Sequence, residues 1–236
     1  MADSEIERAL CVMAHPDDVD FAAAGTVAAW TDAGIEVTYC IVTNGDAGGF
    51  DPEVPRKDIA GIRQAEQRAA AKAVGVSDVR FLGYPDGRLE VSLDLRCDIA
   101  RVIREVRPQR MVSPSPIRHM VRIPASHPDH LAAGEAALSA MYPDARNPFA
   151  FTDRLGDLEA WSVSETWITG GERVNHYVDV TATFERKKSA LLEHTSQITD
   201  PDGLHDMLIG WLGGNAEAAG WENGRLAEAF WVMDTG

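Results

Sequence analysis

Short apolar runs alternate with longer helical patterns along the first 140 residues, and this alternation constrains the fold more than any other feature. Nearly uninterrupted apolar runs are typical of strands covered on both faces. The predicted strands are 9–15, 36–43, 79–84 and 110–116. Apolar residues at three- and four-residue spacing indicate helices between them. The predicted helices are 18–34, 58–76, 91–108 and 127–142. The pattern predicts a Rossmann-like three-layer α/β fold, with a mainly parallel sheet covered by helices on both faces.

The pattern is less regular in the last third of the chain. Residues 164–170 and 176–181 are predicted strands, and residues 182–198 and 224–233 are predicted to be partly helical. The sequence shows no internal repeat, no low-complexity tract and no linker-like segment. We therefore expect a single domain over residues 1–236.

Composition excludes some classes of partner. The chain has 22 Lys and Arg residues against 37 Asp and Glu residues, a formal charge of −15, which disfavours binding to nucleic acids and anionic membranes. No apolar stretch approaches the roughly 18 residues needed to span a bilayer. Cys11, Cys40 and Cys97 are far apart in apolar stretches, which favours buried free thiols in a reducing, cytoplasmic setting. The oligomeric state stays open, a homo-oligomer included.

Polar residues follow each of the first four predicted strands. His15-Pro16-Asp17-Asp18 stands where the first strand gives way to a helix. Asp46 follows the second strand, Asp86 follows the third, and the segment 126–130 lies beyond the fourth. Ligands of open α/β sheets bind beyond the carboxyl ends of the strands, so these residues predict a site at one sheet edge. Asp46 can equally stabilise a turn.

The two His-Pro-Asp runs predict a metal centre. His15, Asp18 and His130 offer two imidazoles and one carboxylate, a set that suits Zn²⁺ first and Fe²⁺ as well. Asp17 is the expected general base. His127 is the expected stabiliser of a developing oxyanion, oriented and charged by Asp129.

A simpler interpretation explains part of each run. Pro16 and one aspartate suit the start of a helix, and Ser126 with Pro128 suits another. Capping explains neither the second aspartate nor the histidines. Both runs at one predicted edge favour the metal centre.

Other polar residues have ordinary default interpretations. Arg63 and Glu66 are three residues apart on a helix, where a solvated ion pair is the default. His176, His194 and His205 are expected at the surface or half buried. The segment 118–122 carries two arginines and a histidine, which suit either an anionic substrate group or a solvated loop.

Several motifs together resemble one family. In chain order they are "AHPDD", "TNGDAGG", "RQAE", "YPDG", "HPDH", "HTSQ" and "AEAF". This order resembles the LmbE/PIG-L family of zinc-dependent de-N-acetylases, and the match runs from about residue 9 to residue 231. The family usually has Glu where this chain has Asp20, and Gly where it has Ala24.

The resemblance implies roles for individual residues. It implies zinc ligands at His15, Asp18 and His130 and a general base at Asp17. It also implies that His127 assists as an acid or as an oxyanion stabiliser, tuned by Asp129. It also implies substrate contacts at Arg63, Asp46 and Asp86.

The expected function is removal of the N-acetyl group from a glucosamine-containing small molecule, by attack of zinc-bound water. One alternative is an amidase of a larger amide, such as a mycothiol S-conjugate. A second alternative is a non-catalytic Rossmann-like module that binds a sugar or nucleotide. The second is disfavoured because no G-x-G-x-x-G follows the first strand.

Overall fold

The computed structural model describes the backbone of residues 1–236 and every side chain except that of Pro124. The strands are β1 (Arg8–Met13), β2 (Glu36–Thr43), β3 (Asp78–Tyr84), β4 (Arg110–Pro114), β5 (Glu165–Thr169), β6 (His176–Asp179) and β7 (Ala227–Asp234). The α-helices are α1 (Asp18–Asp32), α2 (Arg56–Ala73), α3 (Leu93–Val106), α4 (Pro128–Ser139), α5 (Thr152–Leu155), α6 (Phe184–Leu192) and α7 (Pro201–Ala218). Short 3₁₀ or π turns cover η1 (Asp3–Glu5), η2 (Ile123–Ser126) and η3 (Ala140–Ala145).

The described strands form one sheet in the order β3-β2-β1-β4-β5-β7-β6. The first five of these strands pair in parallel, whereas β7 pairs antiparallel with both β5 and β6. The order in which the chain adds strands reverses between β1 and β4: β2 and β3 lie on one side of β1, and β4 and β5 lie on the other. In α/β sheets the ligand crevice lies at this switch point, beyond the carboxyl ends of the two strands.

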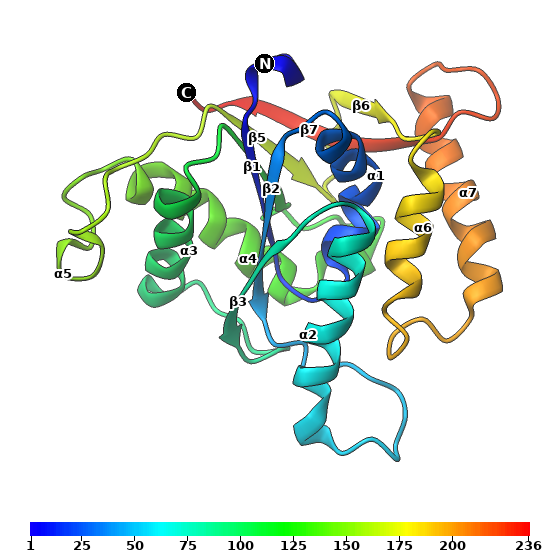
Figure 1. The fold of residues 1–236 in the computed structure, drawn as a ribbon, viewed down its shortest axis with the longest axis horizontal. Coiled ribbons are helices and arrows are strands. Elements are labelled where there is room, and N and C mark those ends of the chain that lie inside the picture. The colour runs from blue at the N-terminus through cyan, green and yellow to red at the C-terminus, as the bar shows by residue number, and fades with distance from the viewer.

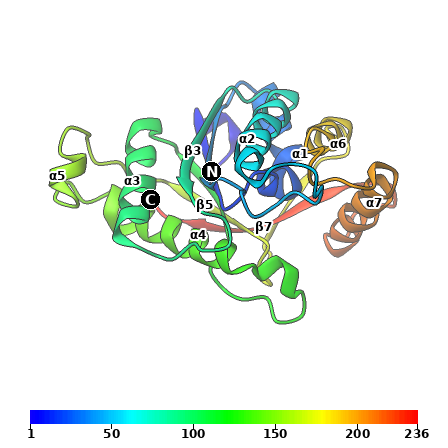
Figure 2. The same ribbon diagram turned by 90° about the horizontal axis from the view of Figure 1, so that it is seen from below.

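Alternate residues of β1 enter two different cores. Ala9, Cys11 and Met13 pack with α1 and α2 on one face of the sheet. Leu10 and Val12 pack with α3 and α4 on the other. Figures 1 and 2 show α3 and α4 on one side of the central strands and α1, α2 and α6 on the other. The predicted three-layer α/β fold is confirmed.

One prediction for the end of the chain is wrong, and one helix there was missed. Residues 224–233 were expected to be partly helical, but Ala227–Asp234 is strand β7, which lies between β5 and β6. Helix α7 was not predicted. It lies outside α6 (Figure 1) and buries Leu204, Leu208 and Leu212 in a third core.

All three cysteines are free and buried, as predicted. Among the described residues, no helix has the length and apolar character that crossing a bilayer requires.

Candidate metal centre and active site

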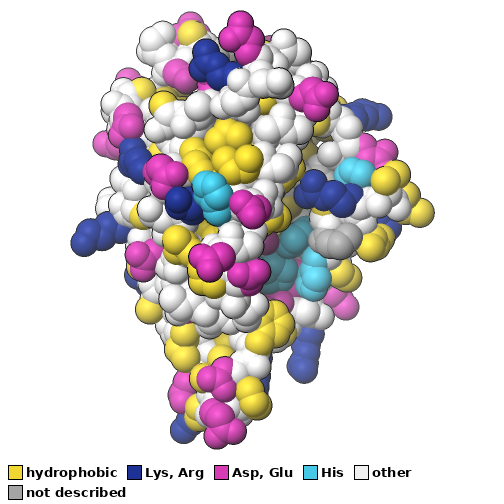
Figure 3. All heavy atoms as spheres, turned by 90° about the vertical axis from the view of Figure 1, so that its right-hand side faces the viewer, with side chains coloured by type: hydrophobic (Ala, Val, Ile, Leu, Met, Phe, Trp, Pro, Cys, Tyr) yellow, Lys and Arg dark blue, Asp and Glu magenta, His cyan; other side chains and the backbone are white. Residues whose placement is uncertain are grey.

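The fold brings the polar strand tips together. His15 and Asp18 follow β1, Asp86 follows β3, and His127 and His130 stand at the start of α4, beyond β4. These segments meet at the switch point between β1 and β4. Figure 3 shows a hollow on this face of the molecule in which histidine side chains gather.

The turn after β1 separates the two neighbouring aspartates. Asp17 precedes α1 with a left-handed backbone, φ 90°. This conformation costs about 1–2 kcal/mol for a residue with a Cβ. Asp18 Oδ2 accepts a hydrogen bond from the His15 backbone N at 2.8 Å. The carboxylate of Asp17 instead lies 3.2 Å from the Arg63 guanidinium. The two carboxylates therefore have different partners and are free to take different roles.

The start of α4 differs from the prediction in one respect. His127, and not Ser126, is the N-cap residue, and its Nδ1 accepts a hydrogen bond from the Asp129 backbone N at 3.2 Å. Ser126 ends η2, and its Oγ accepts from the His119 backbone N. Pro128 occupies the first turn of the helix, as predicted.

Donor atoms of three residues converge at the switch point: one nitrogen each of His15 and His130, and both carboxylate oxygens of Asp18. His15 Nδ1 lies 3.2 Å from His130 Nε2 and 3.3 Å from Asp18 Oδ2. His130 Nε2 lies 3.0 Å from Asp18 Oδ1. The edge of a tetrahedral shell with metal–nitrogen bonds of about 2.0–2.1 Å is about 3.3 Å. The spacing of these nitrogen and oxygen atoms therefore fits one divalent cation held by the three residues.

The contacts of the other ring nitrogen in each imidazole leave His15 Nδ1 and His130 Nε2 as acceptors. His15 Nε2 lies 3.0 Å from Asp86 Oδ1 and 3.2 Å from Asp129 Oδ2, so it carries the proton. His130 Nδ1 faces the Ala125 carbonyl at 3.4 Å. Carboxylates and carbonyls behind the ligand histidines are typical of metal centres, where they fix the tautomer. The donor set suits a cation, because the lone pairs of His15 Nδ1 and His130 Nε2 face each other.

The surrounding charges favour positive charge at this point. Burial lowers the pKa of His15, but the Asp18, Asp129 and Asp86 carboxylates outweigh burial and raise that pKa to about 12. Burial raises the pKa of Asp18, but His130 and His15 hold it well below its usual range. A cation placed among these groups meets an ionised carboxylate.

The pKa of Asp17 is shifted in the opposite direction from that of Asp18. Burial, and then the Asp18 charge, raise the pKa of Asp17 to about 6, although Arg63 opposes the rise. Its side chain is 16% exposed, so solvent and substrate can reach it. A carboxylate with a raised pKa is suited to accepting a proton near neutral pH.

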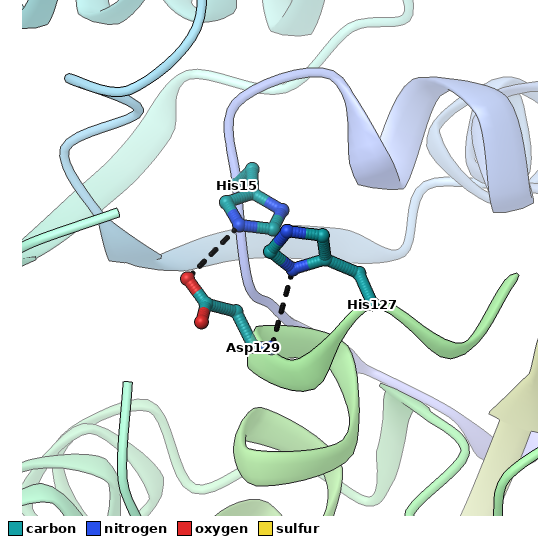
Figure 4. Close-up of side chains that lie close together, drawn as sticks. All are labelled: His15, His127 and Asp129. Atoms are coloured by element: carbon teal, nitrogen blue, oxygen red, sulfur yellow. Dashed lines mark hydrogen bonds and ion pairs between the residues drawn. The ribbon is translucent and has the colours of Figure 1, made fainter. Parts of the chain in front are cut away.

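His127 lies beside His15, with its ring centroid 4.9 Å from that of His15 (Figure 4). Since His127 Nδ1 accepts from a backbone N–H, the proton of the neutral ring is on Nε2. Burial and the charge on His15 lower the pKa of His127, whereas Asp129 raises it. The ring is therefore held as a neutral hydrogen-bond donor.

Asp129 contacts a different histidine from the one expected. Its carboxylate accepts from the Gly87 and Leu89 backbone N atoms at 2.7 and 3.2 Å and faces His15 (Figure 4). No hydrogen bond between this carboxylate and the His127 ring occurs among the described side chains. Asp129 acts on His127 through its charge and its backbone N–H, not by direct contact of its carboxylate.

The expected ion pair between Arg63 and Glu66 does not form. Both side chains are buried. Arg63 donates to the carbonyls of Gly45 and Pro16 at 3.0 and 2.6 Å and lies 3.5 Å from Asp86 Oδ2. Arg63 thus joins three of the strand tips, and its role as a substrate contact stays a prediction.

Asp46 and Asp86 lie at the same edge. Asp46 Oδ1 accepts from the Asp86 backbone N at 2.9 Å, which joins the loop after β2 to the loop after β3. Their roles as substrate contacts stay predictions.

Three residues of this region were missed. Asp20, Gln67 and His194 are fully buried and hydrogen-bonded to one another, whereas His194 was expected at the surface or half buried. One signal was present: Arg63, Glu66 and Gln67 share one face of α2, and that face is polar although it is buried.

A hollow of about 120 Å³ adjoins Asp18 and His130. Phe21, Arg122 and Trp211 also line it, and the Arg122 guanidinium stands 5.3 Å from the centre of the Trp211 ring. Arg118 donates to the Ser126 carbonyl, so the two arginines of this loop have different surroundings. The hollow gives a ligand a place beside the three donor atoms.

Comparison with known proteins identifies the family. The model of the PIG-L family, described as GlcNAc-PI de-N-acetylase, matches residues 10–141, more than half of the chain. The chain belongs to the PIG-L family. The matched residues include both His-Pro-Asp runs and the three residues whose donor atoms converge.

Relatives of this PIG-L protein include named deacetylases. A diacetylchitobiose deacetylase of Thermococcus kodakarensis is 30% identical over 84% of this chain and 72% of its own. A probable N-acetyl-alpha-D-glucosaminyl L-malate deacetylase 2 of Bacillus cereus is 35% identical over 80% and 82%. A solved structure of N,N'-diacetylchitobiose deacetylase from Pyrococcus horikoshii, in complex with its inhibitor MPG, superposes with a TM-score of 0.89 at 28% identity. That match covers 98% of this chain and 85% of the other.

Proposed function

We propose that this protein is a metal-dependent N-deacetylase of a small molecule containing N-acetylglucosamine. The observation that carries the proposal is the convergence of His15 Nδ1, Asp18 and His130 Nε2 within 3.0–3.3 Å, beside a half-buried Asp17. Membership of the PIG-L family and the named activities of its relatives support the substrate class.

His15, Asp18 and His130 would hold the metal, with Zn²⁺ as the proposed ion. Two imidazoles and one carboxylate leave a coordination position open, which is typical of catalytic sites. An ion held there would supply Lewis-acid chemistry: it would lower the pKa of a coordinated water to about 7 and would polarise the amide carbonyl.

Asp17 supplies the proton transfers, and His127 supplies a hydrogen bond. Asp17 accepts a proton from the attacking water, because its carboxylate is reachable and its pKa is raised to about 6. His127 presents its Nε2–H toward the negative charge that develops on the carbonyl oxygen. Protonated Asp17 then returns the proton to the leaving amine, and the products are acetate and a free amino sugar. Arg63, Asp46 and Asp86 are the proposed substrate contacts.

Asp17→Asn is the test of this assignment. The amide cannot accept a proton from water, so we expect kcat to fall by about 10²–10⁴-fold, a typical range for loss of a general base. Metal content should stay at that of the wild type, because Asp17 is not among the proposed ligands. The measurements are acetate release from N-acetylglucosaminyl substrates and metal analysis of both proteins. Near-normal turnover of Asp17→Asn contradicts the mechanism.

A comparison of substrates tests the reaction class. N-acetylglucosaminyl compounds and cysteinyl amides of glucosamine are offered to the wild type, with a free-amine readout. We expect release from the acetamides only. Cleavage of the larger amides alone identifies an amidase, and cleavage of neither by the metal-loaded protein contradicts the proposed function.

A further inference from the structure

The HTSQ motif, residues 194–197, has no part in the function proposed so far. It follows α6 and lies against two helices of the site. The ring of His194, fully buried, donates from Nε2 to Asp20 Oδ2 of α1 at 2.8 Å. The hydroxyls of Thr195 and Ser196 donate to Glu66 of α2 at 2.9 and 2.7 Å. The motif therefore joins α1 to α2 next to the strand tips.

The contact of His194 with Asp20 continues to Asp17. Gln67 Nε2 donates to the same oxygen, Asp20 Oδ2, at 2.8 Å. Gln67 Oε1 accepts from the Asp17 backbone N at 2.8 Å. Three hydrogen bonds of equal length thus connect the His194 ring with the peptide group of Asp17.

This connection ends on the strained residue of the site. Asp17 is one of three non-glycine residues with positive φ among those that the structure describes. Such residues persist only where the surroundings fix the backbone. Gln67 fixes the N–H of Asp17, and Arg63 contacts its carboxylate.

The direction of the Gln67 amide depends on Asp20. A side-chain amide has one acceptor and one donor end, and only one orientation suits a carboxylate on one side and a backbone N–H on the other. If the amide turned over, its NH₂ group would face the N–H of Asp17. Asp20 in turn depends on His194. The second oxygen of this buried carboxylate, Oδ1, has no hydrogen-bond partner among the described residues, so Oδ2 alone holds the side chain.

We propose that His194 is a positioning residue that holds Asp17 in its left-handed conformation through Asp20 and Gln67. The proposal rests on the proposed function insofar as Asp17 is the base. His194 touches neither the donor atoms nor the hollow beside them. Its loss should therefore change turnover and not substrate binding.

The test is a double-mutant cycle with His194→Leu and Gln67→Met. Each single variant should lower kcat by at least about 10-fold, with KM and metal content within about twofold of the wild type. Two changes on one pathway are not additive. We therefore expect His194→Leu to lower kcat by less than twofold further in the Gln67→Met protein. His194→Gln keeps an N–H donor near the position of Nε2 and should recover most of the lost turnover.

Hydrogen exchange gives a readout that does not depend on activity. The Asp17 amide should exchange faster in His194→Leu and in Gln67→Met than in the wild type. Asp144→Asn is the matched control, since it removes the charge of a buried carboxylate that pairs with the half-buried Arg96 on the far side of the sheet. This control should lose thermal stability without any change in kcat or in exchange at Asp17.

Several outcomes overturn the proposal. Multiplicative losses in the double variant mean that His194 acts by another route. Normal kcat in Gln67→Met overturns it even where His194→Leu does not fold. A wild type that releases no acetate refutes the proposed function alone, and unchanged Asp17 exchange in both variants refutes the positioning role alone.

Discussion

His127 is the residue whose role depends most on which ring nitrogen carries the proton. The backbone N–H of Asp129 donates to Nδ1, so Nε2 is the donor in the neutral ring. We expect His127→Ala to lower kcat by about 10²–10³-fold, the range measured for loss of one oxyanion donor. KM should change little, because the donor acts on charge that develops during the reaction. The measurement is steady-state acetate release.

His205→Ala is the control for this variant, since His205 is an exposed residue of α7 with its ring 5.6 Å from that of Phe184. It should leave both kinetic constants unchanged. A raised KM with unchanged kcat in His127→Ala would instead indicate a role in substrate binding.

At the residue scale, sequence indicated which residues meet but not all of their partners. His15, Asp18 and His130 were expected together, and their donor atoms do converge. The carboxylate of Asp129 was expected to act on His127, but it contacts His15, because backbone N–H groups of Gly87 and Leu89 hold it on that side. Such contacts depend on loop conformation, which no sequence spacing encodes.

At the scale of elements, the close approach of α4 to β4 positions His127 and His130. Gly134 makes this approach feasible, because a Cβ there would lie 2.4 Å from the Pro114 carbonyl oxygen. The clash is with backbone, so β4 and α4 would have to separate. We expect Gly134→Ala to destabilise the protein by about 1–3 kcal/mol, as overpacking of a core does, and to lower activity. Thermal or denaturant unfolding measures the first effect.

Gly61→Ala is the matched control. Gly61 lies within α2, and a Cβ there has open space around it. Alanine is favoured over glycine by up to about 1 kcal/mol in helices, so this variant should be neutral or more stable. Equal stability of the two variants would mean that the α4–β4 contact is not tight.

The elements of the first 140 residues were predicted because their apolar periodicity matches their packing. The last elements were not. Residues of β7 such as Ala227, Glu228 and Met233 favour helices, but pairing with β5 and β6 overrides that preference. In α7, Gly210, Gly213 and Gly214 weaken the helical signal, although Leu204, Leu208 and Leu212 recur at four-residue spacing.

At the scale of the whole molecule, elements from the two ends of the chain pack together. Strand β7 lies in the sheet that contains β1, and Glu228 of β7 accepts from the backbone N atoms of Gly25 and Thr26 in α1 at 3.0 and 2.8 Å. We infer one domain over the whole chain, as the sequence predicts. In such a domain, changes at the strand-tip site affect the stability of the whole molecule.

Metal binding should therefore stabilise the entire fold. An ion that binds the native site and not the unfolded chain adds about 4 kcal/mol when its free concentration is 1,000 times Kd. For a chain of this length that corresponds to a rise in Tm of about 8–16 °C. We expect a chelator to lower Tm by this order and Zn²⁺ to restore it. Asp18→Asn weakens one proposed ligand and should lose most of the response, whereas Asp144→Asn should keep it. If both variants respond equally, the stabilising ion is bound elsewhere.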